Sequence, residues 1–156
     1  MEREERKQPM ASVEVEIGTR DLLIRTLQEM GCPVTIDKNQ NIEFAYQGQH
    51  FIAQATNEYH TITVHYPWWG QCSLYDVEQF SLLKNVINEA NMRCRVATFH
   101  TISDEGDVVG VHSRREFVFI PQIPRITDYT HAMLNEFFHA RHFVDGELER
   151  LKNANK

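Results

Sequence analysis

The sequence has few of the residues that build disulfide frameworks, membrane spans or phosphate-binding loops. Its three cysteines, Cys32, Cys72 and Cys94, are odd in number and include no C-x-x-C pair. Free thiols in a reducing cytoplasm are therefore the simplest interpretation. No apolar run approaches the roughly 20 residues that a membrane helix requires. The seven glycines are too scattered to form a nucleotide cradle.

Basic residues are also scarce. The chain has 16 Lys and Arg against 22 Asp and Glu, which gives a net charge of −6 at pH 7. DNA or RNA is therefore not expected as the main partner, because neutralising phosphates requires a basic surface. The charged N-terminus has no apolar region behind it, so it is not predicted to be a signal peptide. We expect residues 1–17 to form a flexible or partly ordered segment and residues 18–156 to form a single cytoplasmic domain.

The motifs of common catalytic sites are missing as well. The sequence contains neither G-x-S-x-G nor H-E-x-x-H. Each cysteine lies in a segment without the neighbouring base that a thiol nucleophile needs. We therefore expect no catalytic residue, no metal and no cofactor, and a protein that is not an enzyme.

The residues that are present are typical of one ordinary globular domain. The chain has 156 residues, 42% of them hydrophobic, and a chain of this length buries about two-thirds of its unfolded surface. Apolar residues at helical spacing predict helices over residues 19–30, 74–91 and 127–151. Thr19 is the expected cap of the first helix. Ser73 and Asp76 stand in capping-box spacing before the second.

Alternation of apolar and polar residues predicts the strands. Residues 41–66 have the pattern of a three-stranded meander, residues 93–120 that of a long hairpin, and residues 33–37 that of a short additional strand. The predicted fold class is therefore α+β. An antiparallel sheet of five to six strands packs against helices, in the order helix, three or four strands, helix, two strands, helix.

The predicted turns fix a register that can be tested. A turn centred on Gln47-Gly48 pairs Phe44 with Phe51, and a turn centred on Asn57-Glu58 pairs Phe51 with Val64. Both turns place the same apolar set on one face of the sheet. A slip of one residue would mix the two faces, so this agreement supports the meander.

The hairpin over residues 93–120 gives a further test. A turn centred on Glu105-Gly106 pairs Ile102 with Val109, and the same register places Arg95 opposite Glu116. Opposite charges that face each other across two strands stabilise the pairing.

The segment Tyr66-Pro67-Trp68-Trp69-Gly70 is predicted to be a loop between a strand and a helix, and its aromatic residues can be interpreted in two ways. They cap the core, or one tryptophan stays partly exposed and anchors a partner, since Trp is enriched in binding hot spots. Both interpretations stay open for Trp68 and Trp69. Tyr66, Trp68 and Trp69 are the candidate partner-binding residues.

Histidines form the other candidate cluster. His131, His139 and His142 lie on the last predicted helix, where they could hold a metal, but on the side opposite its apolar stripe. A solvated polar face is the favoured interpretation. The predicted register also places His50 beside His65 on a polar sheet face. Such a face could respond to pH or bind a partner, although ordinary solvent exposure of these sheet residues is the favoured interpretation.

Several segments together carry a resemblance to a known family. The chain is similar to the YbjN-like family of bacterial sensory transduction regulators over about residues 19–150. The residues that carry the resemblance are Met30-Gly31-Cys32, the segment 41–48, Ile87-Asn88-Glu89-Ala90-Asn91 and Phe137-Phe138. The resemblance implies a type III secretion chaperone-like fold in a small cytoplasmic protein, often dimeric, that binds rather than catalyses. It implies no catalytic residues.

Three hypotheses of function follow. The first is a protein-binding or chaperone-like regulatory module of a bacterial cytoplasm, with a protein partner and a homodimeric state. The second is a small-molecule sensor whose pocket is lined by Tyr46, Phe51, Tyr66, Trp68 and Trp69. The third is a metal-dependent enzyme that uses the three histidines of the last helix.

Overall fold

The computed structural model describes residues 16–154. The prediction for residues 1–17 falls almost entirely outside this range. The elements are α1 (Thr19–Glu29), β1 (Val34–Ile36), β2 (Ile42–Tyr46), β3 (Gln49–Gln54), β4 (Thr61–Ser73), α2 (Val77–Arg93), β5 (Ala97–Ile102), β6 (Val108–Val118) and α3 (Ile126–Ala154). The predicted α+β class and element order are confirmed, with four strands between α1 and α2. None of the helices within residues 16–154 is both long and apolar enough to cross a membrane.

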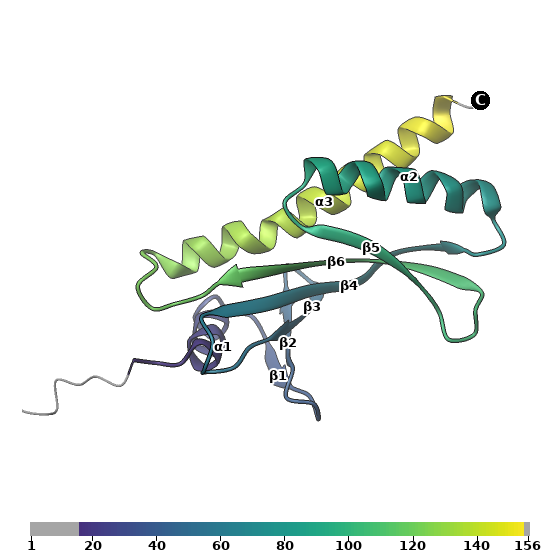
Figure 1. Cartoon of the computed structure of the whole chain (residues 1–156). Coiled ribbons are helices and arrows are strands. Elements are labelled where there is room, and N and C mark those ends of the chain that lie inside the picture. Colours follow the sequence, from purple (N-terminus) through teal and green to yellow (C-terminus); the bar gives the residue numbers. More distant parts are fainter. Residues whose placement is uncertain (1–15, 155–156) are drawn as a thin grey trace, which may run out of the picture.

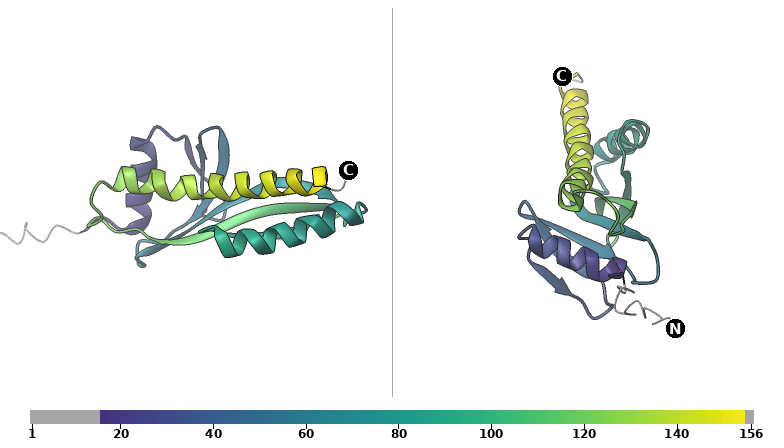
Figure 2. Two further views of the ribbon diagram at one scale, coloured as in Figure 1. Left: turned by 90° about the horizontal axis from the view of Figure 1, so that it is seen from above. Right: turned by 90° about the vertical axis from the view of Figure 1, so that its left-hand side faces the viewer.

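The six strands form one antiparallel sheet in the order β1-β2-β3-β4-β6-β5 (Figure 1). Helices α2 and α3 lie side by side over one face of the sheet, and α1 runs across α3 (Figure 2). The core lies between the sheet and these helices. Phe51, Tyr66, Phe117 and Phe137 are among its fully buried or nearly buried side chains.

Both predicted helix starts differ from the structure in detail. Gly18 is the N-cap of α1, and the Thr19 hydroxyl instead donates to the carbonyl oxygen of Phe119 at 3.1 Å. Asp76, rather than Ser73, caps α2: its carboxylate accepts a hydrogen bond from the Gln79 N–H at 3.0 Å. The Asp76 carboxylate satisfies one of the backbone donors that a helix start leaves free.

The register of the sheet agrees with the sequence in two of the three turns. Phe44 pairs with Phe51 and Ile102 with Val109, as predicted. The pairing of β3 with β4 differs from the prediction by two residues: Ala53, rather than Phe51, lies opposite Val64. The turn between these strands is longer than predicted. A shift of two residues leaves every side chain on its predicted face, since side chains alternate with a period of two.

Two cross-strand predictions are wrong. His65 lies opposite Ile52 and not beside His50, as a result of the two-residue shift. Arg95 is not paired with Glu116 in a ladder, because β5 begins only at Ala97.

Candidate functional site

The segment that was predicted to be a loop lies inside β4 and distorts it. Tyr66 pairs with Ser113 on β6, and Gly70 pairs with Val111, so that Pro67, Trp68 and Trp69 together face the single residue between them on β6. Proline has no N–H for a ladder hydrogen bond and is found in sheets at bulges or edges. The Pro67 bulge sends the two tryptophans to opposite faces of the sheet.

The two tryptophans have opposite environments as a result. Trp69 is only 8% exposed, and its indole N–H donates to the Ser113 hydroxyl at 3.1 Å in the core. Trp68 is 43% exposed, on the face that α2 and α3 do not cover. Its backbone has φ of 51°, in the left-handed region that bulky residues rarely adopt.

The Trp68 ring lies over β6 at a residue without a side chain. A Cβ atom built on Gly110 would come within 2.7 Å of three carbon atoms of the Trp68 indole. The indole N–H donates to the side-chain oxygen of Gln71 at 2.9 Å. The absent side chain at Gly110 and the Gln71 hydrogen bond therefore both keep the indole flat on the sheet.

His112 supports Trp68 from beneath. Its Nδ1 atom accepts a hydrogen bond from the Trp68 backbone N–H at 2.8 Å, and its Nε2 atom lies 2.6 Å from the Thr101 hydroxyl. The imidazole packs edge-on against the Trp68 indole and is stacked on the Phe99 ring, with ring centroids 5.0 and 5.3 Å away. The bulge frees the Trp68 N–H from the ladder, and His112 supplies the acceptor that this donor needs.

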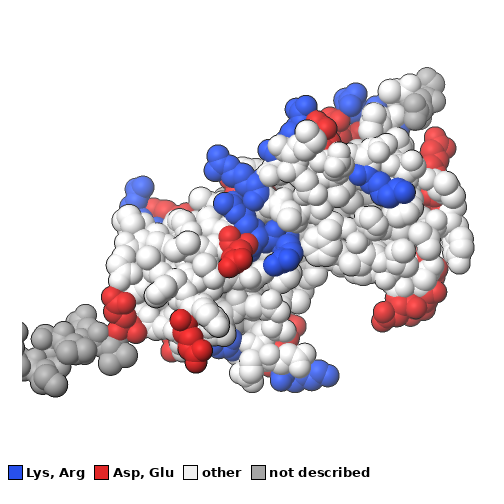
Figure 3. All heavy atoms as spheres, viewed as in Figure 1, with Lys and Arg blue, Asp and Glu red and all other residues white. Residues whose placement is uncertain are grey.

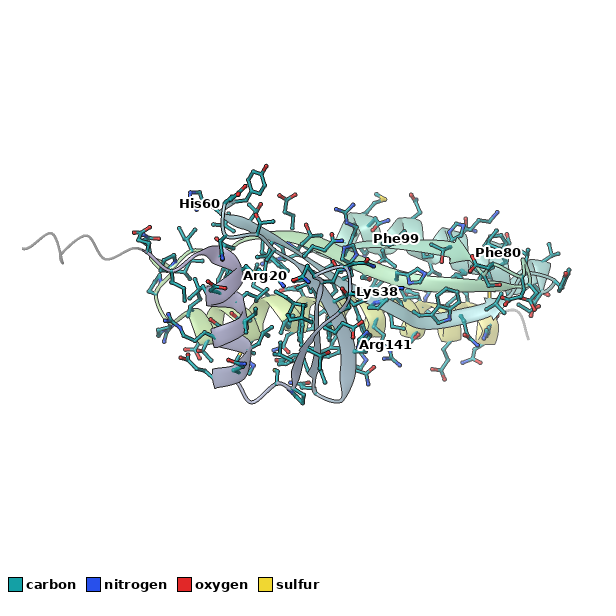
Figure 4. The ribbon with its side chains drawn as sticks, turned by 90° about the horizontal axis from the view of Figure 1, so that it is seen from below. Arg20, Lys38, His60, Phe80, Phe99 and Arg141 are labelled. Carbon is teal, nitrogen blue, oxygen red and sulfur yellow. The ribbon has the colours of Figure 1, made fainter. Side chains whose placement is uncertain are left out.

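We call this surface of β4, β5 and β6 the open face, defined by His65, Trp68, Phe99, His112 and Arg114. Figure 4 shows the sheet from below, with Phe99 on the side turned away from α2 and α3. Burial lowers the pKa of His112, and burial together with Arg114 lowers the pKa of His65. Both imidazoles are therefore neutral near pH 7, and Arg114 is the charged residue among the five that define the open face, with Glu116 two residues further along β6.

Strand β5 borders the open face and forms one edge of the sheet. Its six residues, Ala97 to Ile102, include no charged residue and no proline. The opposite edge, β1, has three residues, with Pro33 before it and Asp37-Lys38 after it. Natural sheets protect their edges with charges, proline, bulges or short strands. Strand β1 has such protection, and β5 does not.

The predicted partner-binding residues thus separate into core and surface. Tyr66 is 2% exposed and Trp69 is buried as well, so both are core residues that an approaching partner does not reach. Trp68 is the member of the three that a partner can contact, and its role stays a prediction. Sequence reasoning missed Phe99 and His112, although the predicted hairpin register already paired them across β5 and β6.

The aromatic pocket of the sensor hypothesis is occupied by its own side chains. Phe51 stacks on Tyr66 with ring centroids 4.6 Å apart, and Tyr46 packs edge-on against Phe51. Of the five residues proposed to line the pocket, Trp69 contributes to the groove of about 390 Å³ between α2 and α3, and the other four do not. Phe51, Tyr66 and Tyr46 thus pack directly against one another at the place proposed for the pocket.

The three histidines of α3 do not converge. His131 Nδ1 lies 3.0 Å from the Tyr46 hydroxyl, so His131 packs against the sheet and not on the solvated side that was predicted. His139 is exposed beside Glu136, and His142 is exposed too. Within residues 16–154, no three His, Cys, Asp or Glu side chains are placed to share a metal ion.

The cysteines also lack the environment of a nucleophile. All three are unpaired thiols. Burial raises the pKa of Cys32, Cys72 and Cys94, with Asp76 adding to the effect at Cys72 and Glu136 at Cys94. A reactive cysteine needs a lowered pKa, so these thiols are structural in character.

Comparison with known proteins identifies a similar fold but indicates no function. The chain matches no family model and no curated protein. It is similar to the crystal structure of an uncharacterized protein from Methanothermobacter thermautotrophicus, with a TM-score of 0.54 and 11% sequence identity over 85% of this chain and 97% of that one. This likeness shows that the fold also occurs elsewhere.

Proposed function

We propose that the protein is a non-enzymatic binding module that presents the open face to a protein partner. The conformation of Trp68 carries the proposal. A bulky residue in the left-handed region costs about 1–3 kcal/mol, and such strain is concentrated at functional sites. Here the strained residue is a half-exposed tryptophan, the residue type most enriched in binding hot spots.

The surroundings of Trp68 support a protein rather than a charged ligand. Phe99 and the uncharged edge strand β5 adjoin it, and Arg114 is the charged member of the open face. Aromatic residues at the centre of a patch with polar residues at its rim are typical of protein–protein interfaces.

We further propose a chaperone-like regulatory role of the kind found in the YbjN-like family. The support is the resemblance of the sequence segments together with the element order, in which α1, four strands, α2, two strands and α3 follow one another. A fold does not determine a function, so this part of the proposal depends on finding the partner. The three unpaired thiols support a reducing cytoplasm as the location, and the resemblance to the YbjN-like family implies a bacterial one.

A homodimer formed through β5 belongs to the same proposal. A two-fold axis perpendicular to the sheet near Phe99 and His100 would pair the β5 strands of two copies. It would bring Arg95 of one copy to the turn after β5 in the other, where Asp104 and Glu105 lie. Figure 3 shows acidic side chains gathered at the lower right, at this turn, and a basic band across the middle of the molecule. The complementary charges at the two ends of β5 favour this antiparallel arrangement.

Affinity capture with matched variants tests the binding proposal. Trp68→Ala removes the exposed indole, and Met92→Ala removes a side chain that is 75% exposed on α2 and outside the open face. We expect wild type and Met92→Ala to retain the same protein from an extract of the native host, and Trp68→Ala to lose it. Melting curves of the three proteins control for folding. Equal recovery by all three would show that the open face is not the binding surface.

A further inference from the structure

The hydrogen bonds of His112 fix its protonation state in the folded protein. Nδ1 accepts from the Trp68 backbone N–H, so Nδ1 carries no proton. The single proton of the neutral ring is therefore on Nε2, which donates to the Thr101 hydroxyl. The arrangement has no place for a second proton on this imidazole.

A second proton on the ring would place two hydrogen-bond donors, the Nδ1–H of His112 and the backbone N–H of Trp68, against each other. A proton on Nδ1 would point at the Trp68 N–H, which lies 2.8 Å away, and the hydrogen bond would be lost. The left-handed backbone of Trp68 would then lack the hydrogen bond of its own N–H, and only the contacts of the indole ring with Gln71 and Gly110 would remain. Because strained residues persist only where their surroundings determine them, we expect Trp68 to leave its position.

We propose that His112 is a proton-sensitive support of the open face: when its imidazole is protonated, Trp68 is released and binding through this face weakens. The meaning of the switch for a partner rests on the proposed function. The structural change itself does not, because it takes place within a single chain.

Few charged groups compete with His112 for this role. Arg114 and Glu116 lie two and four residues further along β6 on the same face, and His65 of β4 lies opposite Arg114. The residues of β5 that share the face are Ala97, Phe99 and Thr101, none of which is charged. His65 is thus the second titrating group, and the experiment has to separate it from His112.

The direction of the pH effect follows from burial. Burial lowers the pKa of His112 below its ordinary value of about 6.5. The unfolded chain therefore binds the proton first as the pH falls, and the folded state loses stability through the window from about 6.5 down to the folded pKa. Near pH 7 the ring is neutral and Trp68 stays in place.

Nuclear magnetic resonance of the wild-type protein tests the proposal directly. The ¹⁵N shifts of the His112 ring should show a proton on Nε2 and none on Nδ1 at about pH 7.5. The backbone amide and indole signals of Trp68 should move together as His112 titrates, with a midpoint below about 6.5. A proton found on Nδ1 at the higher pH would overturn the inference.

Two variants assign the titration. His112→Asn keeps an acceptor near the Nδ1 position but cannot titrate, so the pH response of the Trp68 signals should disappear. His65→Asn removes the neighbouring histidine, and the response should remain. The inference is wrong if the response persists in His112→Asn, and its loss in His65→Asn would assign the titration to His65 instead. The ring-nitrogen measurement on wild type decides the matter even if His112→Asn does not fold.

Capture at two pH values separates this inference from the binding proposal. Wild type should retain its Trp68-dependent partner at about pH 7.5 and lose most of it at about pH 5.5. For His112→Asn, whose own affinity can differ from that of wild type, the amount retained should be the same at both pH values. Equal retention by wild type at both values would reject the switch and leave the binding proposal intact. If no Trp68-dependent partner exists at either value, the binding proposal fails, and the resonance experiment still decides whether His112 controls Trp68.

Discussion

Gly110 carries no side chain, and the Trp68 indole occupies the space above it. A methyl group at this position would lie 2.7 Å from ring carbons, which is closer than van der Waals contact allows. We therefore expect Gly110→Ala to lift the indole off β6 and to lower the free energy of unfolding by about 1–3 kcal/mol, as overpacking does. Urea denaturation measures the loss, and a change in Trp68 fluorescence reports the displaced ring.

Gly146 provides the matched control for this substitution. It lies within α3, and a Cβ atom built on it meets nothing within 4 Å. Gly146→Ala should stabilise the protein by about 0.5–1 kcal/mol, because alanine loses less backbone entropy in a helix. Similar losses for both substitutions would mean that the space above Gly110 is not specifically required.

The separation of Trp68 from Trp69 could not be read from the sequence. Simple alternation from Tyr66 would place Trp68 in the core and Trp69 on the surface, whereas the structure has the reverse. The Pro67 bulge adds two residues to β4 between Tyr66 and Gly70, and the alternation of faces is inverted for Trp68 and Trp69 within the bulge itself. The pattern identified the segment as important, but only the tertiary pairing with β6 determines which tryptophan is exposed.

Helix α2 begins at a cap that a single substitution can test. The Asp76 carboxylate accepts from the Gln79 N–H, while the Ser73 hydroxyl accepts from the Tyr75 N–H before the helix starts. Asp76→Ala should cost about 1 kcal/mol, a value typical of a lost N-cap. Ser73→Ala should cost less, because it leaves the helix donor satisfied. Thermal unfolding of the two variants compares the positions, and a larger loss for Ser73→Ala would contradict the assignment of the cap.

The strands show which parts of a register local sequence can determine. The β2–β3 turn at Gln47-Gly48 is tight, and its pairing was predicted correctly. In the β3–β4 turn, the apolar–polar pattern at Tyr59 and His60 does not show where β4 begins. The predicted pairing of β3 with β4 was therefore wrong by two residues. The predicted apolar faces were still correct. The apolar pattern indicates which side chains face the core, whereas the length of the turn determines which residues pair across the strands.

The overall fold could be predicted from the sequence, whereas the candidate site could not. Three amphipathic helices and alternating strands with short turns are sufficient to predict an antiparallel sheet with one helical layer. The open face depends on contacts among Trp68, Phe99 and His112, which come from three strands and share no local motif. The histidines of α3 that share one helix were the more conspicuous cluster in the sequence, yet the fold separates them.

The uncharged edge of β5 leads to a prediction about assembly. If two copies pair through β5, Arg95→Glu should weaken the dimer, because the new carboxylate would face the acidic turn of the partner copy. Adding Asp104→Lys and Glu105→Lys to the same chain should restore it, since the two ends of the strand then exchange their charges. Lys38→Glu changes the net charge equally but lies next to β1, and it should leave the dimer unchanged.

Light scattering coupled to size-exclusion chromatography measures the mass. A monomeric wild type, or a triple variant no more dimeric than Arg95→Glu alone, would reject pairing through this edge. High salt should weaken the wild-type dimer, because exposed charge pairs are screened.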